Sequence, residues 1–534
     1  MEQIALNFDD LFEDTNSSQV QVAPVTNKTY EDFDFHKLQV YGGIDCIATL
    51  ELLEKEFEAV LKPGKGHPPI INSYLEIEQP AQEFIIDLEI NGMKYSSSVN
   101  RWFHHKMEKR IPELDDKIFS YIGKSIDLNS GKVVAEFLYG EKGLIPPYKT
   151  KAGEPAVDGQ ALMTLAGLDP TGNKYTTQDP SLQYLADMAM RKDISAVHNT
   201  FIKTYIEDFV KIDGRLHPSY NQFGTSSFRI TGSEPNLTQL PRPTHGYNVR
   251  CCYIVEDGTV FISFDFSSAE VKVLANIAKE PAMLKAISDG LDFHSFSASS
   301  MRQIPYAEFV AIIKDTSSKL HKEYKFLRQL SKILTFSILY GSSVKGIASQ
   351  LNIEVSKAEE LVNLYFRTFP KIRDYILASH EYTKRYMLSL TPLGQIKRQY
   401  GVMDCFRKTA AYNAALRNSQ NVIIQSTTSS IGLATFAELN RRIKPFGAKS
   451  VCTVYDSIEI ECPIQHAAEV LQIGFDTLNN YPVETFDFLE LPIGCEGDIG
   501  ISWGETKEIK EGVTQLELFG IIENLRVDNA KTFV

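Results

Sequence analysis

The sequence predicts an α+β fold built from several domains. The chain has 534 residues, of which 43% are hydrophobic, and this is enough to bury more than one core. Apolar residues recur with helical spacing over most of residues 99–210 and again over 300–400. Residues 213–265 instead have the pattern of strands and turns, and residues 448–462 have the pattern of a hairpin. Long helical blocks separated by short strand regions are typical of α+β proteins.

The N-terminal third predicts a polar start, a helix and a boundary. Residues 1–30 are acidic and then rich in Asn, Ser, Gln and Thr, so we expect them to be poorly ordered. A helical segment that contains Tyr41 and Asp45 follows. Pro and Gly at 63–69 then mark a boundary. Beyond it, residues 84–90 alternate between apolar and polar types before Asn91-Gly92, which is typical of a strand.

Charge and cysteine content limit the classes of protein. The net charge of −13 argues weakly against nucleic acid as a partner, but binding depends on where the cations lie. Seven scattered cysteines without Cys-x-x-Cys spacing indicate a reducing compartment and no structural zinc. No apolar stretch approaches the length of a membrane span, and the acidic start is not a signal peptide. We therefore expect a cytoplasmic protein without a membrane partner.

Two apolar runs each end on an aspartate. Residues 260–264 precede Asp265, and residues 451–455 precede Asp456. An aspartate at the end of a strand is often only a turn former or a helix cap. Two such carboxylates at strand ends are also the ligands that a pair of divalent metal ions needs.

A stripe of basic and then aromatic side chains lies between the two aspartates. Arg328, Lys332, Phe336 and Tyr340 are each four residues apart, so they share one face of a helix that ends at Gly341. A solvated helix face or an aromatic core stripe has similar spacing. Cations followed by aromatic rings also suit a triphosphate with a base attached, and together with the aspartates they indicate templated nucleotidyl transfer.

These motifs occur in the order found in one polymerase family. The motifs are Thr225-Ser226-Ser227-Phe228-Arg229-Ile230 with Pro235-Asn236-Leu237, Asp265 to Glu270, Asp292-Phe293-His294, the stripe from Arg328 to Gly341, Arg417-x3-Asn421-x3-Gln425, and Tyr455-Asp456-Ser457. The chain resembles family A DNA polymerases, the DNA polymerase I group, from about residue 41 to about residue 503. The resemblance implies a right-hand polymerase fold with an antiparallel palm sheet and helical fingers and thumb.

The resemblance also implies a division of the chain into domains. The expected parts are residues 1–65 as a disordered N-terminus with the end of a 3′–5′ exonuclease domain, 66–98 as a connector linked to the palm, 99–210 as the thumb, 211–300 as the palm with Asp265, 301–400 as the fingers, 401–505 as the palm with Asp456, and 506–534 as a C-terminal tail. Tyr41 and Asp45 match the Tyr-x3-Asp motif at the end of that exonuclease domain, although they also suit an ordinary helix. Because only 40 residues precede Tyr41, we expect the chain to begin inside this domain and a separate exonuclease chain to complete it.

The resemblance assigns the metal and nucleotide ligands. Asp265, Asp456 and the carbonyl of Phe266 would bind two Mg²⁺ ions, with Mn²⁺ able to substitute. Arg328, Lys332 and His294 would hold the triphosphate, with Lys332 also counted as catalytic, and Phe336, Tyr340 and Ser268 would line the nucleotide site. Glu270 would exclude a 2′-hydroxyl, which favours dNTPs over ribonucleotides. Phe336 in place of tyrosine implies rejection of dideoxynucleotides.

Primer–template DNA is the implied macromolecular partner. Arg229 and the stripe Arg417, Asn421 and Gln425 would contact the minor groove, where Arg, Asn and Gln test pair geometry without reading sequence. Arg250 would be a further basic contact. A polar helix face of this kind is otherwise ordinary solvated surface.

Three features depart from the family or extend it. Ser457 follows Asp456 where the family has glutamate, and Phe228 precedes Arg229 where the family has glycine. Glu459 and Glu461 lie further along the strand after Ser457, and we do not assign either as a ligand. The tail contains Gln515, Leu516, Leu518 and Phe519, which resemble a peptide that docks into bacterial sliding clamps; a small helix packed on the palm is the alternative.

We expect a DNA polymerase of phage replication, and two alternatives stay open. A catalytically reduced scaffold that bridges DNA or is tethered to a clamp is disfavoured by the presence of Asp265, Lys332 and Asp456. A single-subunit RNA polymerase or a reverse transcriptase is disfavoured by Glu270.

Overall fold

The computed structural model describes residues 35–532 except 66, 151, 169–174, 206–208, 352 and 405–408. The chain divides into two compact units, Met1–Lys62 and Pro63–Val534. The expected disorder of residues 1–30 lies outside the described residues. In the first unit, α1 (Phe35–Leu61) is a single helix that contains positions 41 and 45, whose side chains also lie outside the described part. Most of its large apolar side chains from Ile44 to Leu61 are exposed.

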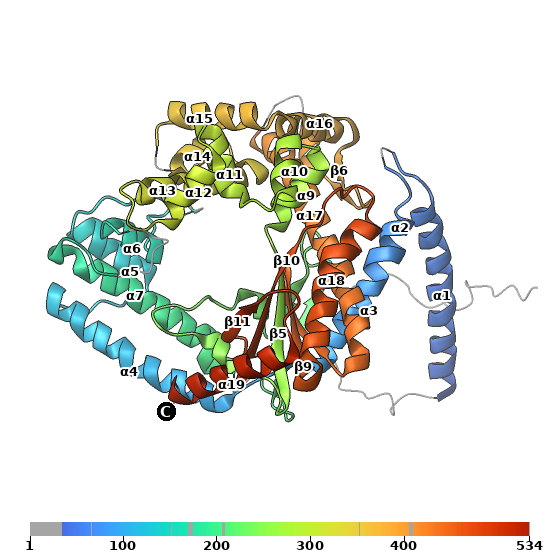
Figure 1. The fold of residues 1–534 in the computed structure, drawn as a ribbon, viewed down its shortest axis with the longest axis horizontal. Coiled ribbons are helices and arrows are strands. Elements are labelled where there is room, and N and C mark those ends of the chain that lie inside the picture. The colour runs from blue at the N-terminus through green and yellow to red at the C-terminus, as the bar shows by residue number, and fades with distance from the viewer. Residues whose placement is uncertain are drawn as a thin grey trace, which may run out of the picture. The chain divides into compact units, whose positions relative to one another are not determined.

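The second unit is organised around a five-stranded antiparallel sheet (Figure 1). The strand order is β11-β10-β5-β9-β8. The strands are β5 (Thr259–Phe266), β8 (Lys449–Val454), β9 (Ser457–Pro463), β10 (Cys495–Ser502) and β11 (Glu505–Ile509). The structure therefore confirms the hairpin expected over residues 448–462, with Tyr455 and Asp456 at its turn.

Alternation along the central strand assigns the two faces of the sheet. Ile262 and Phe264 of β5 belong to the main hydrophobic core, which also contains Phe436 of α17 (Ala410–Ile443) and Phe475 of α18 (Ala467–Thr485). Successive strand residues point to opposite faces, so Asp265 lies on the face away from this core. The buried apolar residues that precede Asp265 therefore hold it in place at the end of β5.

The segment after the boundary is helical, which corrects the strand expected over residues 84–90. The structure has α2 (Ile71–Ser73), a π-helical turn (Tyr74–Glu78) and α3 (Gln79–Asn91). Phe84 and Leu88 are buried four residues apart, and Ala81 and Ile85 extend the same face, so burial follows the helical period. The alternating pattern arises because Ile86 and Ile90 are apolar although they are exposed on the helix.

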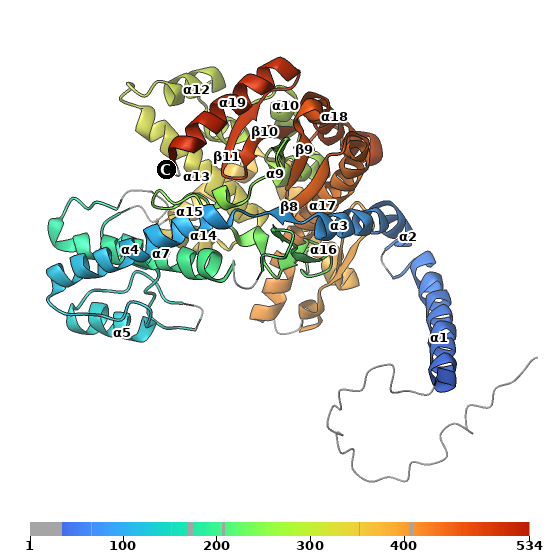
Figure 2. The same cartoon turned by 90° about the horizontal axis from the view of Figure 1, so that it is seen from below.

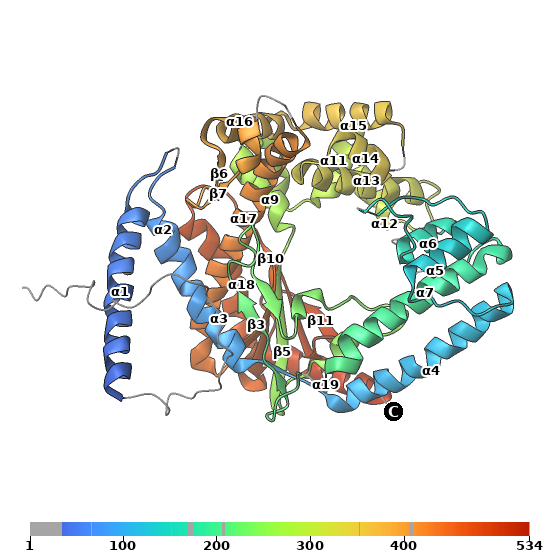
Figure 3. The same cartoon turned by 180° about the vertical axis from the view of Figure 1, so that it is seen from behind.

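The described part of residues 97–205 is mostly helical, and its middle, from Ile118 to Ala189, has a separate hydrophobic core. They are α4 (Ser97–Ile122), α5 (Gly131–Ala135), α6 (Gly159–Leu165) and α7 (Gln183–Val197), with π-helical turns at Glu136–Glu141 and His198–Lys203. This core includes Leu128, Leu162 and Leu185. Figure 3 shows α4 and α7 running side by side away from the sheet. The helical periodicity expected over residues 99–210 is confirmed for the described part of that range.

Residues 269–386 are also helical, as expected for 300–400. The helices are α9 (Ala269–Ala278), α10 (Pro281–Ser288), α11 (Phe293–Arg302), α12 (Tyr306–Lys314), α13 (His321–Leu339), α14 (Val344–Leu351), α15 (Val355–Thr368) and α16 (Pro370–Tyr386). A short hairpin, β6 (Leu388–Leu390) and β7 (Ile396–Arg398), follows them.

Short strand pairs and 3₁₀ turns fill the region between the helices and β5. The strand β1 (Met93–Lys94) pairs with β2 (Arg215–Leu216), and β3 (Ser219–Asn221) pairs with β4 (Thr231–Ser233). Two 3₁₀ turns follow, at Leu237–Gln239 and Val249–Cys252. This agrees with the strand-and-turn pattern of residues 213–265.

The C-terminal residues belong to the second unit's core. The strand β11 is an edge of the main sheet, and α19 (Gln515–Thr532) packs against β10 and α18 (Figure 2). Leu518 and Ile522 of α19 are part of the main hydrophobic core. The domain boundaries inferred from the resemblance stay predictions. None of the helices in the described part of the chain is both long and apolar enough to cross a membrane.

Candidate active site

The backbone holds Asp265 and Asp456 at the same end of the sheet. Asp265 is the last residue but one of β5, and its Cα partner on β9 is Ser457. The Phe266 N–H donates a 3.0 Å hydrogen bond to the carbonyl of Asp456. The hairpin turn is therefore fastened to the end of the central strand, and both carboxylates project from this junction.

Negative charge accumulates at Asp265. Its Cα partner on β10 is Glu496, and Asp498 is two residues further along that strand. Removal of water by the surrounding protein, together with the charges of Asp456 and Glu496, raises the pKa of Asp265 to about 7. Desolvation by the nearby protein also raises the pKa of Asp456, and a backbone hydrogen bond and Arg229 oppose the shift. The side chains of both aspartates are nevertheless exposed to solvent. Neither aspartate forms an ion pair with a described residue.

Glu459 is a third carboxylate on this face, and it is fully buried. It lies two residues after Ser457 on β9, opposite Ser263 of β5, and only 1% of it is exposed. The Ser457 hydroxyl donates to Oε1 of Glu459 at 3.1 Å, while Oε2 has no partner among the described residues. Burial raises the pKa of Glu459 to about 7. Glu461, two residues further on, is instead paired with Arg215 at 2.7 Å.

The donor set fits a divalent cation that prefers oxygen. Two unpaired carboxylates meet at one sheet end, and a cation between them would offset the repulsion that adds to desolvation in raising the pKa of Asp265. Mg²⁺ is commonly held by one or two carboxylates together with substrate phosphates and water, so a pair is sufficient. In the described part of the chain no group of three or more His, Cys, Asp or Glu side chains is arranged to hold a metal.

The basic and aromatic stripe lies on α13 as expected, but its first member is paired. Arg328 donates two 2.8 Å hydrogen bonds to the two carboxylate oxygens of Asp292, the N-cap residue of α11. Burial alone would raise the pKa of Asp292, but hydrogen bonds from Arg328 and Ser295 outweigh burial and lower the pKa to about 2. Lys332 is exposed and has no ion-pair partner among the described residues.

His294 lies beside the stripe as a neutral ring. It is 5% exposed, and its ring centroid is 5.7 Å from that of Phe336. Burial lowers the pKa of His294 to about 4, with the charges of Arg328 and Lys332 acting in the same direction and Asp292 opposing them. At neutral pH it therefore contributes a hydrogen-bonding ring and no charge.

Glu270 links the α13 stripe to the end of the sheet that carries Asp265 and Asp456. The Tyr340 hydroxyl donates to Oε2 of Glu270 at 2.8 Å, and Arg229 donates to Oε1 at 2.6 Å. The Arg229 guanidinium also lies 5.3 Å from the ring centroid of Tyr455, the residue before Asp456. A continuous chain of contacts, Tyr455–Arg229–Glu270–Tyr340, therefore joins the β8–β9 turn to the end of α13.

A glycine brings the end of α13 against α17. Gly341 has φ +69, and a Cβ on it would lie 2.7 Å from the carbonyl oxygen of Arg417. Only glycine fits both the left-handed backbone and this close approach. Arg417 is exposed, Asn421 and Gln425 are half-buried, and Oδ1 of Asn421 has no partner among the described residues. The α17 stripe thus begins beside the end of the α13 stripe.

The remaining predicted residues have mixed surroundings. Arg250 is half-buried over the ring of Trp503, at 5.0 Å from its centroid, and donates to the carbonyl of Leu240, so it braces the fold. Ser268 is the N-cap residue of α9, with φ 55, and is exposed. Phe228 has φ 55, so this chain holds phenylalanine in the left-handed conformation that glycine adopts easily.

The predicted clamp peptide is helical. Gln515 accepts from the N–H of Ala468 and donates to the carbonyl of Ile464, and Leu518 is 0% exposed. Leu516 and Phe519 are exposed. An extended peptide in a clamp groove would need α19 to leave the core, so the structure favours the alternative of a helix packed on the sheet.

Three residues that shape this site had no role assigned to them from the sequence, although Asp292 stands in one of the motifs and Glu459 was noted on the strand after Ser457. Asp292 is the partner of Arg328, Glu459 is the buried carboxylate beneath Ser457, and Arg242 is the cation that opposes the raised pKa of Asp265. Period-two alternation along β9 was a signal for Glu459, since residues 457, 459 and 461 share one face. Asp292 belongs to the motif Asp292-Phe293-His294, and no local signal marks Arg242.

Comparison with known proteins agrees with this geometry. The model of the family described as DNA polymerase family A matches residues 98–505, more than half of the chain. DNA polymerase I of Chloroflexus aurantiacus is 25% identical over 480 residues, which cover 88% of this chain and 47% of the relative. The thermostable DNA polymerase I of Thermus aquaticus is 26% identical over 460 residues, covering 86% of this chain and 51% of that protein. The chain spans about half the length of these curated relatives.

A solved structure gives the same result for the fold. The POL domain of Pol1 from M. smegmatis, described in complex with DNA primer-template and dNTP, superimposes with a TM-score of 0.68 and 25% identity, covering 80% of this chain and 70% of that chain. The architecture is thus the right-hand polymerase fold that the motifs predicted. The family match, the relatives and this shared fold all lead to one assignment: the chain belongs to DNA polymerase family A.

Proposed function

We propose that this protein is a template-directed DNA polymerase that adds dNTPs to a primer 3′-hydroxyl. The observation that carries the proposal is the chain of contacts from Tyr455 through Arg229 and Glu270 to Tyr340. It connects a pair of strand-end carboxylates with a helix that carries cations and aromatic rings. Metal binding and triphosphate binding thereby become parts of one site.

Divalent cations belong to this proposal, with Asp265, Asp456 and the carbonyl of Phe266 as their ligands. Bound there, two Mg²⁺ ions, or Mn²⁺ in their place, would lower the pKa of the primer hydroxyl and offset the charge of the leaving pyrophosphate. The unpaired carboxylates and the raised pKa of Asp265 support this assignment.

The residues of α13 would bind the triphosphate. Lys332 is an exposed, unpaired cation that can neutralise charge on the β- and γ-phosphates as the α-phosphate is attacked and pyrophosphate leaves. Arg328 is held by Asp292 with its guanidinium plane fixed, and it can use its remaining N–H groups or exchange partners when phosphate arrives. The neutral ring of His294 supplies a hydrogen-bond donor.

Sugar and base would lie against the aromatic end of the stripe. Glu270 accepts a hydrogen bond from Tyr340 and, before DNA binds, one from Arg229, so its carboxylate is held where a 2′-hydroxyl would lie. Phe336 has no hydroxyl to replace a missing 3′-OH contact, which favours rejection of dideoxynucleotides.

DNA would lie along α17 and the segment before β5. Arg417, Asn421 and Gln425 share one face of α17 next to the end of α13, so they would read the minor groove of the newest base pairs. Arg229 would join them once its bond to Glu270 is exchanged. Arg250 is assigned here to stability and not to DNA.

The biological setting extends the proposal. We place the protein in phage DNA replication in the host cytoplasm, with a separate exonuclease chain completing the segment around Tyr41 and Asp45. A sliding clamp that engages Gln515, Leu516, Leu518 and Phe519 is the least supported partner, because Leu518 is buried in the core.

A primer-extension assay with the purified chain tests the proposal. A labelled primer annealed to a template of known sequence, with Mg²⁺ and one dNTP at a time, should grow only when the dNTP matches the next template base. Extension without a template, or extension with ribonucleotides alone, would contradict template-directed DNA synthesis. A protein that binds primer–template but never extends it would support the scaffold alternative instead.

A further inference from the structure

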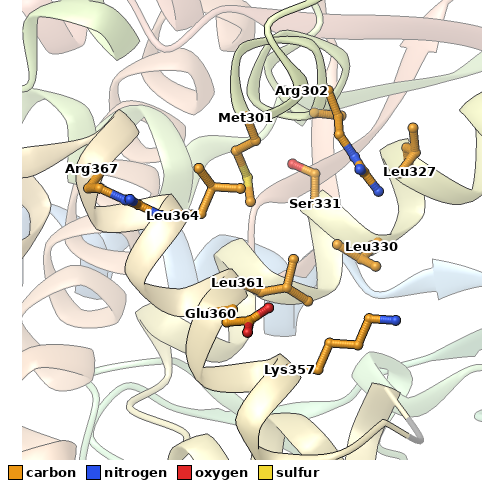
Figure 4. A pocket seen from close by; sticks show the side chains of 11 residues that line it. Met301, Arg302, Leu327, Leu330, Ser331, Lys357, Glu360, Leu361, Leu364 and Arg367 are labelled. Atoms are coloured by element: carbon orange, nitrogen blue, oxygen red, sulfur yellow. The ribbon is translucent and has the colours of Figure 1, made fainter.

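A pocket of about 380 Å³ lies behind the α13 stripe, between α11, α13 and α15 (Figure 4). Its apolar wall consists of Met301 of α11, Leu327 and Leu330 of α13, and Leu361 and Leu364 of α15. The volume is near the lower end of the range of about 300–1,000 Å³ for small-molecule sites. None of the residues assigned above to metal, nucleotide or DNA lines it.

One buried polar atom faces this apolar wall. Ser331 is 1% exposed, and its hydroxyl has no hydrogen-bond partner among the described residues. Figure 4 shows Ser331 among the side chains that line the pocket, with its hydroxyl oxygen on the side of Met301 and closed off from solvent. Buried hydroxyls in folded proteins are normally hydrogen-bonded, so a polar atom of a ligand that reached Ser331 would satisfy this unpaired hydroxyl.

The rim of the pocket is positively charged. Arg302 of α11 and Lys357 and Arg367 of α15 line it together with one carboxylate, Glu360. All four are exposed, and none forms an ion pair with any described residue. The three cations outnumber the single carboxylate, so the rim attracts an anionic group. The apolar part of the same ligand can then pack on the apolar wall.

We propose that this pocket binds a small amphipathic anion, with an apolar body on the leucine and methionine wall and a carboxylate, sulfonate or phosphate at the arginines. The Ser331 hydroxyl would bond the polar atom nearest the body. A nucleotide base fits poorly, because its several ring nitrogens and carbonyls would meet a single hydroxyl and otherwise apolar side chains. The chemistry therefore selects an aliphatic or aromatic acid.

An occupant of the pocket would also act on nucleotide addition, and this half of the inference rests on the proposed function. Leu327 and Ser331 touch the pocket, while the next residue after each, Arg328 and Lys332, points about 100° away around the same helix. A ligand wedged between α13 and α15 would fix the orientation of α13. Its binding and triphosphate binding would then be coupled through one rigid element.

Fluorescence of 8-anilinonaphthalene-1-sulfonate, an aromatic sulfonate, tests binding directly with the full chain. We expect saturable binding at one site, weakened at least tenfold in the double variant Arg302→Ala/Arg367→Ala. Arg373→Ala is the matched control, since Arg373 is an exposed arginine of α16 that does not line the pocket. Leu330→Trp, which fills the pocket without removing charge, should weaken binding as well.

Equal affinity in the wild type and in both the double variant and Leu330→Trp would overturn the proposal, because the probe would then be binding elsewhere. Absence of saturable binding would show that the pocket is not a binding site for this class of ligand. The coupling is measured in the primer-extension assay: the saturating sulfonate should change the extension rate of the wild type and of Arg373→Ala, but not that of the double variant. An unchanged wild-type rate despite binding refutes the coupling. If no protein extends a primer at all, the proposed function fails, whereas the fluorescence result still decides the site.

Discussion

The hydroxyl of Tyr340 donates a 2.8 Å hydrogen bond to Oε2 of Glu270, 70 positions earlier in the chain. Tyr340 caps the end of α13, and Glu270 lies in the first turn of α9, five residues after Asp265. Removal of water and the negative charge of Glu270 raise the pKa of Tyr340, so the phenol stays a proton donor throughout the neutral range. The bond fixes the carboxylate at the place where we put the sugar of the incoming nucleotide.

Replacing Glu270 by Ala should raise ribonucleotide incorporation relative to deoxynucleotide by about tenfold or more, equivalent to about 1.4 kcal/mol of discrimination. The reason is that the change removes the carboxylate that would meet a 2′-hydroxyl. Single-nucleotide extension rates with paired rNTP and dNTP measure the ratio. Glu308→Ala, at an exposed carboxylate of α12, is the control and should leave the ratio unchanged. Tyr340→Phe should have a smaller effect, since it frees the carboxylate without removing it.

Phe336→Tyr should increase incorporation of dideoxynucleotides. The added hydroxyl would replace the contact that a dideoxynucleotide lacks at its 3′ position. Chain termination at fixed ratios of ddNTP to dNTP gives the measurement. Phe326→Tyr, on the exposed side of the same helix, adds the same group away from the stripe and should change nothing. Equal termination by both variants would remove Phe336 from the sugar site.

Glu459→Gln should change the pH dependence of stability. Burial raises the folded-state pKa of Glu459 from about 4.5 to about 7, so between these values the folded state binds more protons than the unfolded state. Stability therefore falls as pH rises through this window. Above it Glu459 is ionised in the folded state, and the free energy of unfolding of the wild type is lowered by the whole penalty of that buried charge. We expect the variant to gain on the order of 1–3 kcal/mol relative to the wild type between pH 4.5 and pH 8.

Thermal or denaturant unfolding of both proteins at the two pH values, with EDTA present, measures this gain. A stability difference between variant and wild type that does not change with pH would show that Glu459 is ionised or protonated equally in both states. Glu461→Gln serves as a contrast, because it breaks the buried pair with Arg215 and should destabilise the protein at both pH values.

Two leucines of α19 distinguish a structural helix from a clamp peptide. Leu518→Ala should destabilise the protein by about 2–5 kcal/mol, since it removes a side chain that is fully buried in the main core. Leu516→Ala, at a residue that is 81% exposed, should leave the free energy of unfolding unchanged. If both variants keep full stability and both lose clamp-stimulated synthesis on long templates, the peptide hypothesis stands and α19 leaves the core to bind.

The features that depend on a local sequence pattern could be predicted from the sequence. Asp265 and Asp456 were found because each ends an apolar run, and the α13 stripe was found because its spacing matches a helix turn. The pairing of Arg328 with Asp292 and of Tyr340 with Glu270 spans 36 and 70 positions, so no local periodicity reports it. The strand expected at residues 84–90 was wrong because two exposed isoleucines imitate alternation, and core packing, which is not local, selected the helix.

We propose that Asp265 and Asp456 bind the metal ions of the polymerase site. Asp265→Asn and Asp456→Asn remove one charge each with almost no change in shape, so primer–template affinity should stay near that of the wild type. Ser457→Ala is the matched control at the adjacent position, where the hydroxyl can donate to Oε1 of Glu459 or to the carbonyl of Val454.

The decisive measurement is the rate of single-dNTP extension by these three variants, with primer–template binding measured in parallel. We expect a loss of at least about 10³-fold for either aspartate variant, equivalent to about 4 kcal/mol, and a change of less than about tenfold for Ser457→Ala. Extension by Asp265→Asn at a rate close to that of the wild type would contradict the assignment of the metal site and the mechanism built on it.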